Sequence, residues 1–212
     1  MQEPPKRRRT SRGTCVLCNT EMGKAQMVRH LEKHRVEQAD APGPCATRWH
    51  VIVEGAYAPE YWLHLDIRAD ATLKKLDSFL RTIWLECCGH MSQFTVGPYG
   101  GQPLGMAREI GPTFTTGLSF HHEYDFGSTT ELNIRVLSEH KGDLSKEAIQ
   151  LLARNTPPVI ACEKCGQPAI WLGGDWEGEY RELCAACCDE EMQQQLLPVV
   201  NSPRAGVCGY KG

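Results

Sequence analysis

The sequence predicts an α+β protein, in which a central mixed or antiparallel sheet carries one principal helix and is flanked by two small zinc modules. Apolar segments with strand-like alternation recur between residues 47 and 156, and one long amphipathic helical segment lies among them. Strands interrupted by one main helix favour an α+β arrangement over regularly alternating βαβ units. Two sets of Cys and His residues with the spacing of zinc ligands lie on either side.

The N-terminal set has the spacing of a two-Cys/two-His zinc finger. Cys15 and Cys18 are followed, after 11 residues, by His30 and His34, which is one residue fewer than usual between the pairs. The histidines are four residues apart, so both leave one face of a helix that we expect over residues 24–37. A bound Zn²⁺ would supply the stability that so small a module lacks. The alternative is a helix with two surface histidines beside an unrelated Cys-x-x-Cys turn.

The C-terminal set consists of two Cys-x-x-Cys pairs with 18 residues between them: Cys162, Cys165, Cys184 and Cys187. Each pair is a turn that brings two thiolates together, and four thiolates complete the tetrahedral shell that Zn²⁺ prefers. The intervening segment is typical of a two-stranded ribbon. We therefore expect two Zn²⁺ ions in all, with disulfides or buried free thiols as the alternative. Cys188 adjoins Cys187, so the identity of the fourth ligand stays open.

The secondary structure between the modules follows from periodicity and turn residues. A helix capped by Asp70 or Thr72 should run to Glu86, with one apolar stripe packed against a sheet. A shorter helix is expected over residues 144–153, and residues 97–112, rich in Gly and Pro, should be irregular. We expect strands at residues 49–53, 61–67, 92–96, 118–125 and 130–138, with ribbon strands at 169–172 and 180–183.

Changes in composition divide the chain into six segments. They are a basic arm (1–13), the finger (14–38), a Pro- and Gly-containing linker (39–46), the α+β domain (47–156), the ribbon (157–190) and a tail (191–212).

The cysteines and the lack of long apolar runs point to a cytoplasmic protein. Eleven cysteines are present, and those outside the two zinc sets are odd in number, which fits a reducing compartment better than a disulfide framework. No apolar run resembles a secretory signal or a membrane span.

The net charge of −3 hides a strong asymmetry. Residues 1–35 carry nine Lys and Arg against three Asp and Glu, whereas the rest of the chain carries 14 against 23. A basic module on an acidic body favours contact with a polyanion, DNA or RNA, although a solvated basic tail is the alternative. Gly23, Gln26 and Arg29 occupy the positions from which a finger helix reads bases. The candidate nucleic-acid contacts are Lys6, Arg7, Arg8, Arg9, Arg12, Lys24, Gln26 and Arg29.

Several residues of the central segment carry a resemblance to a known family. They are Thr72, Leu73, Leu76, Trp84, His90, Phe94 and the run Tyr124-Asp125-Phe126-Gly127. This pattern resembles the plasmid pRiA4b ORF-like family, also described as transposon-passenger (TnpR-like) proteins, over residues 47–140. The resemblance implies a compact α+β domain of bacterial and mobile-element proteins and no established reaction. The chain departs from it after Gly127, where Ser128 replaces the usual acidic residue.

The central segment also contains a Cys and His cluster that is open to two interpretations. Cys87, Cys88 and His90 could form a metal site or a nucleophile pair with a histidine from residues 121–122, or the cysteines could finish a buried helix. We favour the structural interpretation, because adjacent cysteines do not easily bind one metal. Asp125 is similarly more typical of a turn cap than of an acid or base.

Three functions therefore compete. A nucleic-acid-associated zinc protein is favoured, a protein-interaction adaptor is the main alternative, and an enzyme is disfavoured because no complete catalytic constellation is present.

Overall fold

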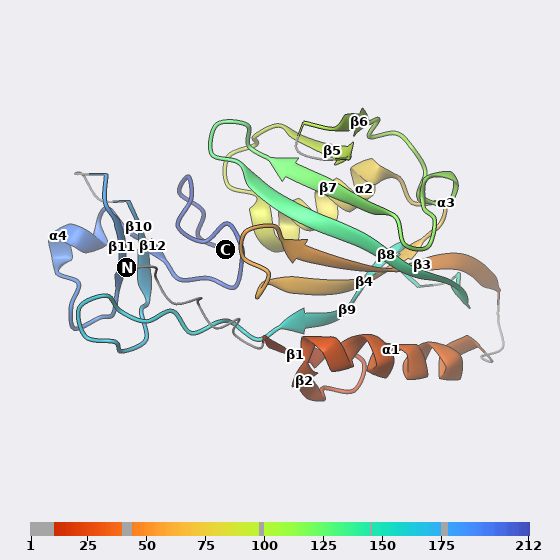
Figure 1. Ribbon diagram of the computed structural model, residues 1–212, viewed down its shortest axis with the longest axis horizontal. Helices are drawn as coiled ribbons and strands as arrows, with labels where there is room; N and C mark the ends of the chain where they lie inside the picture. The colour runs from red at the N-terminus through yellow and green to blue at the C-terminus, as the bar shows by residue number, and fades with distance from the viewer. Residues whose placement is uncertain (1–10, 40–43, 98–99, 145, 175–177) are drawn as a thin grey trace, which may run out of the picture.

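The computed structural model describes residues 11–39, 44–97, 100–144, 146–174 and 178–212, and its strands form two separate sheets (Figure 1). The larger sheet has nine strands in the order β2-β1-β9-β4-β3-β8-β7-β5-β6, and all its described pairings are antiparallel. A three-stranded sheet, β11-β10-β12, lies at one end of the molecule. The expected α+β class is confirmed.

The described strands have the following bounds: β1 Arg12–Cys15, β2 Glu21–Gly23, β3 Cys45–Gly55, β4 Trp62–Arg68, β5 Ser92–Val96, β6 Gln102–Leu104, β7 Ser119–Tyr124, β8 Thr130–Asp143, β9 Ile149–Asn155, β10 Trp171–Gly174, β11 Tyr180–Leu183 and β12 Leu197–Pro198. The helices are α1 Lys24–Ala39, α2 Leu73–Leu80, α3 Ile110–Thr113 and α4 Glu190–Gln193, and a π-helical turn, Arg81–Leu85, extends α2. No described helix has the length and apolar character needed to span a membrane.

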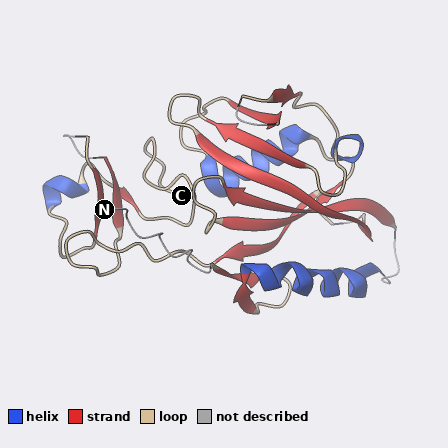
Figure 2. Ribbon diagram, in the orientation of Figure 1, coloured by secondary structure: helices blue, strands red, loops and turns tan. Residues whose placement is uncertain are grey.

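Helix α2 covers one face of the large sheet (Figure 2). Thr72 caps it by accepting a hydrogen bond from the backbone N–H of Lys75 at 3.3 Å. Leu73, Leu76 and Leu80 form the expected apolar stripe, and all three are fully buried in the main core. The helical segment ends at Leu85, since Glu86 is extended.

The helix expected over residues 144–153 is wrong, because this segment contains strand β9. A register shift between His64 and Leu65 in the pairing of β4 with β9 leaves one extra residue on β9. Ile149, Leu152 and Ala153 are consequently the buried apolar residues of β9. Their spacing matches a helical stripe, so the bulge imitates helical periodicity. The segment 97–112 is also less irregular than expected, since it contains β6 and the start of α3.

The finger continues the central sheet instead of standing apart from it. Strand β1 pairs with β9, with Gly13 opposite Asn155 and Cys15 opposite Ala153. Met27 and Leu31 of α1 share a buried cluster with Trp62, Leu152 and Ala153, and α1 runs beside β9 in Figure 1. The module thereby completes its small core with apolar surface of the central sheet.

The C-terminal tail lies between the ribbon and the large sheet (Figure 1). The Ser202 hydroxyl donates to the carbonyl oxygen of Trp84 at 2.6 Å, which joins the tail to the end of the α2 segment. Arg204 is fully buried and donates to the carbonyl oxygen of Ser128 at 3.1 Å. Ser202 and Arg204 therefore anchor the tail to the central domain.

Candidate metal centres

The finger brings its four expected ligand atoms together. Sγ of Cys15 and Cys18 and one ring nitrogen each of His30 and His34 lie within 4.8 Å of one another. His30 Nε2 is 3.2 Å from both Cys18 Sγ and His34 Nε2. Cys15 ends β1, Cys18 lies in the turn before β2, and both histidines leave one face of α1. This arrangement can hold one tetrahedral ion.

Local hydrogen bonds favour a charged ligand in this finger. The turn between the two cysteines is closed by the Asn19 N–H, which donates to the Cys15 carbonyl oxygen at 2.8 Å. The hydrogen bond with the Thr20 hydroxyl, first among several, lowers the pKa of Cys18 to about 6. A thiol must lose its proton to bind a metal, so this turn prepares Cys18 for coordination.

The ribbon brings together its four expected sulfur atoms, those of Cys162, Cys165, Cys184 and Cys187. Cys165 Sγ and Cys184 Sγ are 3.5 Å apart, close to the spacing of about 3.8 Å that Zn–S bonds of about 2.3 Å impose on a tetrahedron. The Gly166 N–H donates to the Cys162 carbonyl oxygen at 2.8 Å, with Gly166 at a φ of 73°. Glycine adopts this left-handed conformation without strain.

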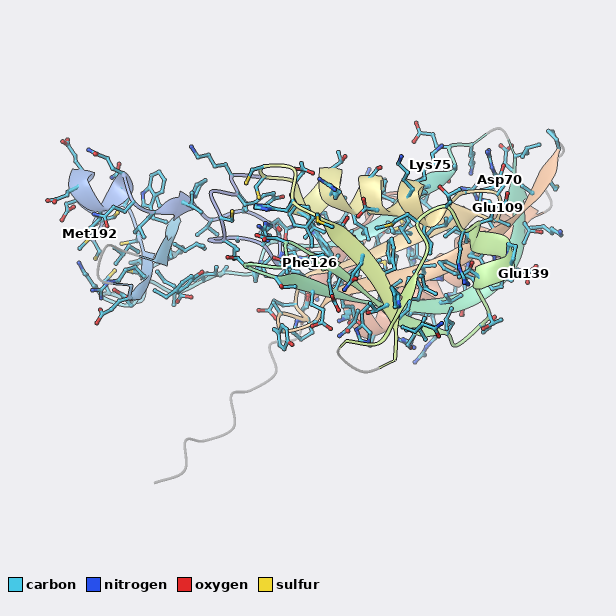
Figure 3. The ribbon with its side chains drawn as sticks, turned by 90° about the horizontal axis from the view of Figure 1, so that it is seen from above. Asp70, Lys75, Glu109, Phe126, Glu139 and Met192 are labelled. Carbon is cyan, nitrogen blue, oxygen red and sulfur yellow. The ribbon has the colours of Figure 1, made fainter. Side chains whose placement is uncertain are left out.

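Cys188 is not one of these four residues. It is buried, and its Sγ lies 3.7 Å from the Asp189 carbonyl oxygen. Met192 of α4 packs beside the cluster, and Figure 3 shows Met192 at the opposite end of the molecule from Glu139 on β8. The ribbon cluster therefore lies at one end of the molecule, and the part of β8 that carries Glu139 lies at the other.

A third cluster of ligand-type residues joins Cys87, Cys88 and His90 to Cys208 of the tail, again with all four ligand atoms within 4.8 Å. No motif in the sequence predicts that Cys208 lies here. The expectation that Cys87 and Cys88 finish a buried helix is wrong, because the helical segment ends at Leu85, Cys87 is half-buried and Cys88 is exposed. Their Sγ atoms lie 3.4 Å apart, so adjacency in sequence does not keep them from converging.

Neither histidine of strand β7 joins this third cluster. Alternation along the strand sends the two rings to opposite faces, as the sequence predicts. His122 is buried, with Nε2 2.7 Å from Asp77 Oδ1, and His121 Nδ1 lies 3.2 Å from Glu131 Oε1.

Asp125 has the expected turn role and an additional partner. Its Oδ1 accepts hydrogen bonds from the backbone N–H groups of Gly127 at 3.1 Å and Ser128 at 3.3 Å. Its Oδ2 accepts from Arg204 Nη2 at 2.7 Å. The hydrogen bond from Arg204 is the largest of the influences that lower the pKa of Asp125 to about 2. An ionised, paired carboxylate of this kind is not available as a general base near neutral pH.

The candidate nucleic-acid contacts are not equally accessible. Lys6, Arg7, Arg8 and Arg9 lie outside the described residues. Lys24 is half-buried in an ion pair with Glu54, and its Nζ donates to the Pro59 carbonyl oxygen at 2.8 Å. Burial lowers the pKa of Lys24 to about 8.

The remaining candidates are exposed. Arg12 pairs with Glu21 at 3.1 Å, and Gln26 and Arg29 lie on the solvent side of α1. The face of α1 that carries Gln26 and Arg29 is therefore accessible to a partner, whereas the Lys24 ammonium is already paired with Glu54.

A groove of about 1440 Å³ separates the finger helix from the ribbon. Its walls come from α1, the large sheet, the ribbon and the tail, and they include Gln26, Ile52, Arg135, Tyr180 and Pro203. Both small modules thus contribute to one concave surface.

Comparison with known proteins assigns neither a family nor a function to the chain. No protein-family model matches the chain, and no curated protein matches it. Among solved structures, a protein of unknown function from Methanosarcina mazei Go1 is similar, with 15% sequence identity and a TM-score of 0.45. The match covers 51% of this chain and 69% of that one.

Proposed function

We propose that the protein binds one zinc ion in the finger and one in the ribbon, and that these ions hold both modules in place around the central sheet. The convergence of four Cys and His ligand atoms in each module carries this proposal. Each set supplies all four ligands from protein side chains, which is typical of closed structural zinc sites and not of catalytic ones.

The surroundings of the two clusters support a structural role. Around the finger, the ligand Cys15 is fully buried in the same cluster as Trp62 and Leu152 of the central sheet. In the ribbon, Cys162 and Cys184 are buried with Leu183 and Leu196. Loss of either metal would leave converging thiols in a small core without the ion that holds them together, so the module would lose stability.

Zinc content of the purified full-length protein tests the proposal. Cys18→Ser and Cys165→Ser should each remove one zinc per chain, as measured by native mass spectrometry and elemental analysis. Cys45→Ser and Cys188→Ser are matched controls and should remove none, because neither sulfur belongs to the metal-ligand clusters found among the described residues. Unchanged zinc content in Cys18→Ser or Cys165→Ser would contradict the assignment of that module.

For the partner, we propose DNA or RNA, bound through the exposed face of the finger helix and the basic arm. Gln26 and Arg29 are exposed at base-reading positions, and their side chains suit adenine and guanine respectively. The resemblance to the pRiA4b ORF-like family adds a bacterial or mobile-element setting to this proposal. One finger spans only about three base pairs, so most affinity would come from phosphate contacts and would fall steeply with salt.

Binding of a fluorescent DNA duplex and an RNA hairpin across a salt series tests this second proposal. Arg29→Ala should weaken binding, and Arg108→Ala, which removes an exposed arginine before α3, should not. Neutralising Lys6, Arg7, Arg8 and Arg9 together should abolish binding. Absence of binding by the zinc-loaded wild type at low salt would contradict the proposal.

The adaptor alternative rests on a separate observation, the groove between the finger and the ribbon. Its lining mixes apolar residues such as Ile52 and Pro203 with the charged Glu182 and Arg135 and the half-exposed Tyr180. A mixed surface of this kind suits a polypeptide better than a uniformly anionic nucleic acid. Binding of a protein partner that persists when the basic arm is neutralised but is lost in Tyr180→Ala would favour the adaptor function.

A further inference from the structure

We propose that Cys87, Cys88, His90 and Cys208 form a third zinc site, which clamps the C-terminal tail to the central domain. The site goes beyond the proposed function, which assigns metals only to the finger and the ribbon. Its ligands come from two segments: the loop after the α2 segment and a turn of the tail some 120 residues further along the chain.

The distances within the cluster are close to those of ligand atoms around one small cation. His90 Nε2 lies 3.1 Å from Cys88 Sγ and 3.2 Å from Cys208 Sγ, and the two sulfur atoms are 3.7 Å apart. Cys87 Sγ is 3.4 Å from Cys88 Sγ. A tetrahedral zinc with bonds of about 2.1 Å to nitrogen and 2.3 Å to sulfur requires separations of about 3.6 and 3.8 Å. Small adjustments of side-chain torsions would reach these values.

The backbone on both sides is shaped to present these side chains. Gly89 has a φ of 76°, and its N–H donates to Glu86 Oε1 at 2.6 Å, which turns the chain between Cys88 and His90. Cys208 itself has a φ of 48°. A non-glycine residue in this region is strained, and such strain often accompanies a functional constraint. Metal coordination by the Cys208 thiol would provide that constraint.

A buried cation lies directly behind the cluster, beside the Cys87 thiol. Arg204 Nη2 is 3.4 Å from Cys87 Sγ, and the same nitrogen pairs with Asp125. Three thiolates around Zn²⁺ leave one net negative charge, and the fully buried Arg204 guanidinium, which also pairs with Asp125, attracts this charge from beside Cys87. Hydrogen-bond donors to ligand atoms orient the ligands and tune their basicity in metal sites generally.

A clamp at this point would also hold one wall of the groove. Tail residues Ser202, Pro203 and Ala205 line the groove, and they immediately precede the turn that carries Cys208. Fixing Cys208 to the loop that holds Cys87 and Cys88 limits the movement of this wall. Metal in the third site would therefore keep the groove in its present shape.

Metal counting on the full-length protein tests the third site separately from the other two. Native mass spectrometry under reducing conditions should show three zinc ions in the wild type, two in Cys208→Ser and three in the control Cys45→Ser. Cys208 is exposed, so its replacement by serine is compatible with folding. His90→Asn is a second variant that should also retain two ions.

Trypsin sensitivity gives an independent readout of the clamp. Cleavage after the buried Arg204 should be slow in the zinc-loaded wild type and at least several-fold faster in Cys208→Ser, while Cys45→Ser should behave like the wild type. Equal cleavage rates in all three proteins would overturn the clamp.

The remaining outcomes separate this inference from the proposed function. Two ions in both the wild type and Cys208→Ser would overturn the third site and leave the finger and ribbon assignments standing. Three ions in Cys208→Ser would exclude Cys208 as a ligand. A non-reduced wild type that carries two ions and is two hydrogen masses lighter would reveal a disulfide in place of a metal. Fewer than two ions in the wild type would contradict the proposed function itself.

Discussion

Arg204 and Asp125 form a buried ion pair across 2.7 Å, although they are 79 residues apart in the sequence. Asp125 directly follows strand β7 in a left-handed conformation with a φ of 66°, and its other oxygen caps the turn into β8. Arg204 also donates to the carbonyl oxygen of Ser128 and the hydroxyl of Thr130. The tail and the β7–β8 turn therefore depend on each other for their polar partners.

This ion pair predicts a large effect of removing the arginine. Arg204→Met leaves a buried carboxylate without its cation, and we expect the free energy of unfolding to fall by about 3–5 kcal/mol. Urea denaturation in the presence of zinc measures the change. Arg12→Met is the control, because Arg12 pairs with Glu21 on an exposed surface and should contribute less than about 1 kcal/mol. Equal effects of the two substitutions would contradict the role given to Arg204.

The junction between the finger and the sheet predicts a steric effect at Gly13. A Cβ atom at this position would overlap the Arg154 carbonyl oxygen and the indole ring of Trp62. Gly13→Ala should therefore destabilise the protein by about 1–3 kcal/mol, as overpacking usually does.

Gly23→Ala is the matched control for Gly13→Ala, because the nearest atom to a Cβ at Gly23 is Gln26 Oε1 at 3.7 Å. Hydrogen exchange of the β1 and β9 amides should accelerate in Gly13→Ala and not in the control. If the β9 amides exchange equally slowly in both variants, the pairing of β1 with β9 does not stabilise β9 as described.

The buried histidine pair on β3 and β4 predicts a pH dependence of stability. His50 Nε2 and His64 Nδ1 are 2.9 Å apart, and burial lowers the pKa of His50 to about 2 and that of His64 to about 3. In the unfolded chain both rings titrate near pH 6.5. Below that pH the unfolded chain therefore binds protons that the folded protein does not, so stability is lost as the pH falls from 6.5 towards 3.

Each histidine should contribute a slope of up to about 1.4 kcal/mol per pH unit in this window. We expect the double variant His50→Gln/His64→Gln to show a shallower fall than the wild type between pH 6.5 and 5.5. Denaturation at constant excess zinc over that range measures it. Parallel curves for the two proteins would show that these rings do not remain neutral in the fold.

The Lys24–Glu54 pair predicts which basic residues matter for nucleic-acid binding. The charge of Lys24 is already compensated by Glu54, so Lys24→Met should change the salt dependence of DNA binding little. Arg29→Ala removes an exposed cation and should reduce the slope of log K against log salt by about 0.9 if it contacts one phosphate. The opposite ranking would show that Lys24 leaves Glu54 on binding.

The sequence predicted the parts of the fold that depend on local patterns. The stripe of Leu73, Leu76 and Leu80 and the cap at Thr72 predicted α2, and the ribbon strand over residues 180–183 coincides with β11. The Cys and His spacings likewise predicted two of the three clusters. In each case the information needed for the prediction is local: it lies in a short segment with a regular apolar pattern or in a recognised spacing of ligand residues.

The remaining features depend on long-range pairing that periodicity does not contain. The bulge opposite His64 gave β9 a helical pattern of apolar residues. The docking of β1 on β9 required knowledge of that strand. Cys208 lies in a tail with no motif, and only the leftover cysteines and the histidine at position 90 signalled an unassigned group of ligands.

Zinc stoichiometry of the intact wild-type protein and of Cys18→Ser and Cys165→Ser, measured side by side by native mass spectrometry, tests the central claim most directly. The account predicts that each variant carries one zinc fewer than the wild type and that Cys45→Ser carries the same number. A wild type free of zinc after purification and reconstitution, or variants that retain its full complement, would contradict it.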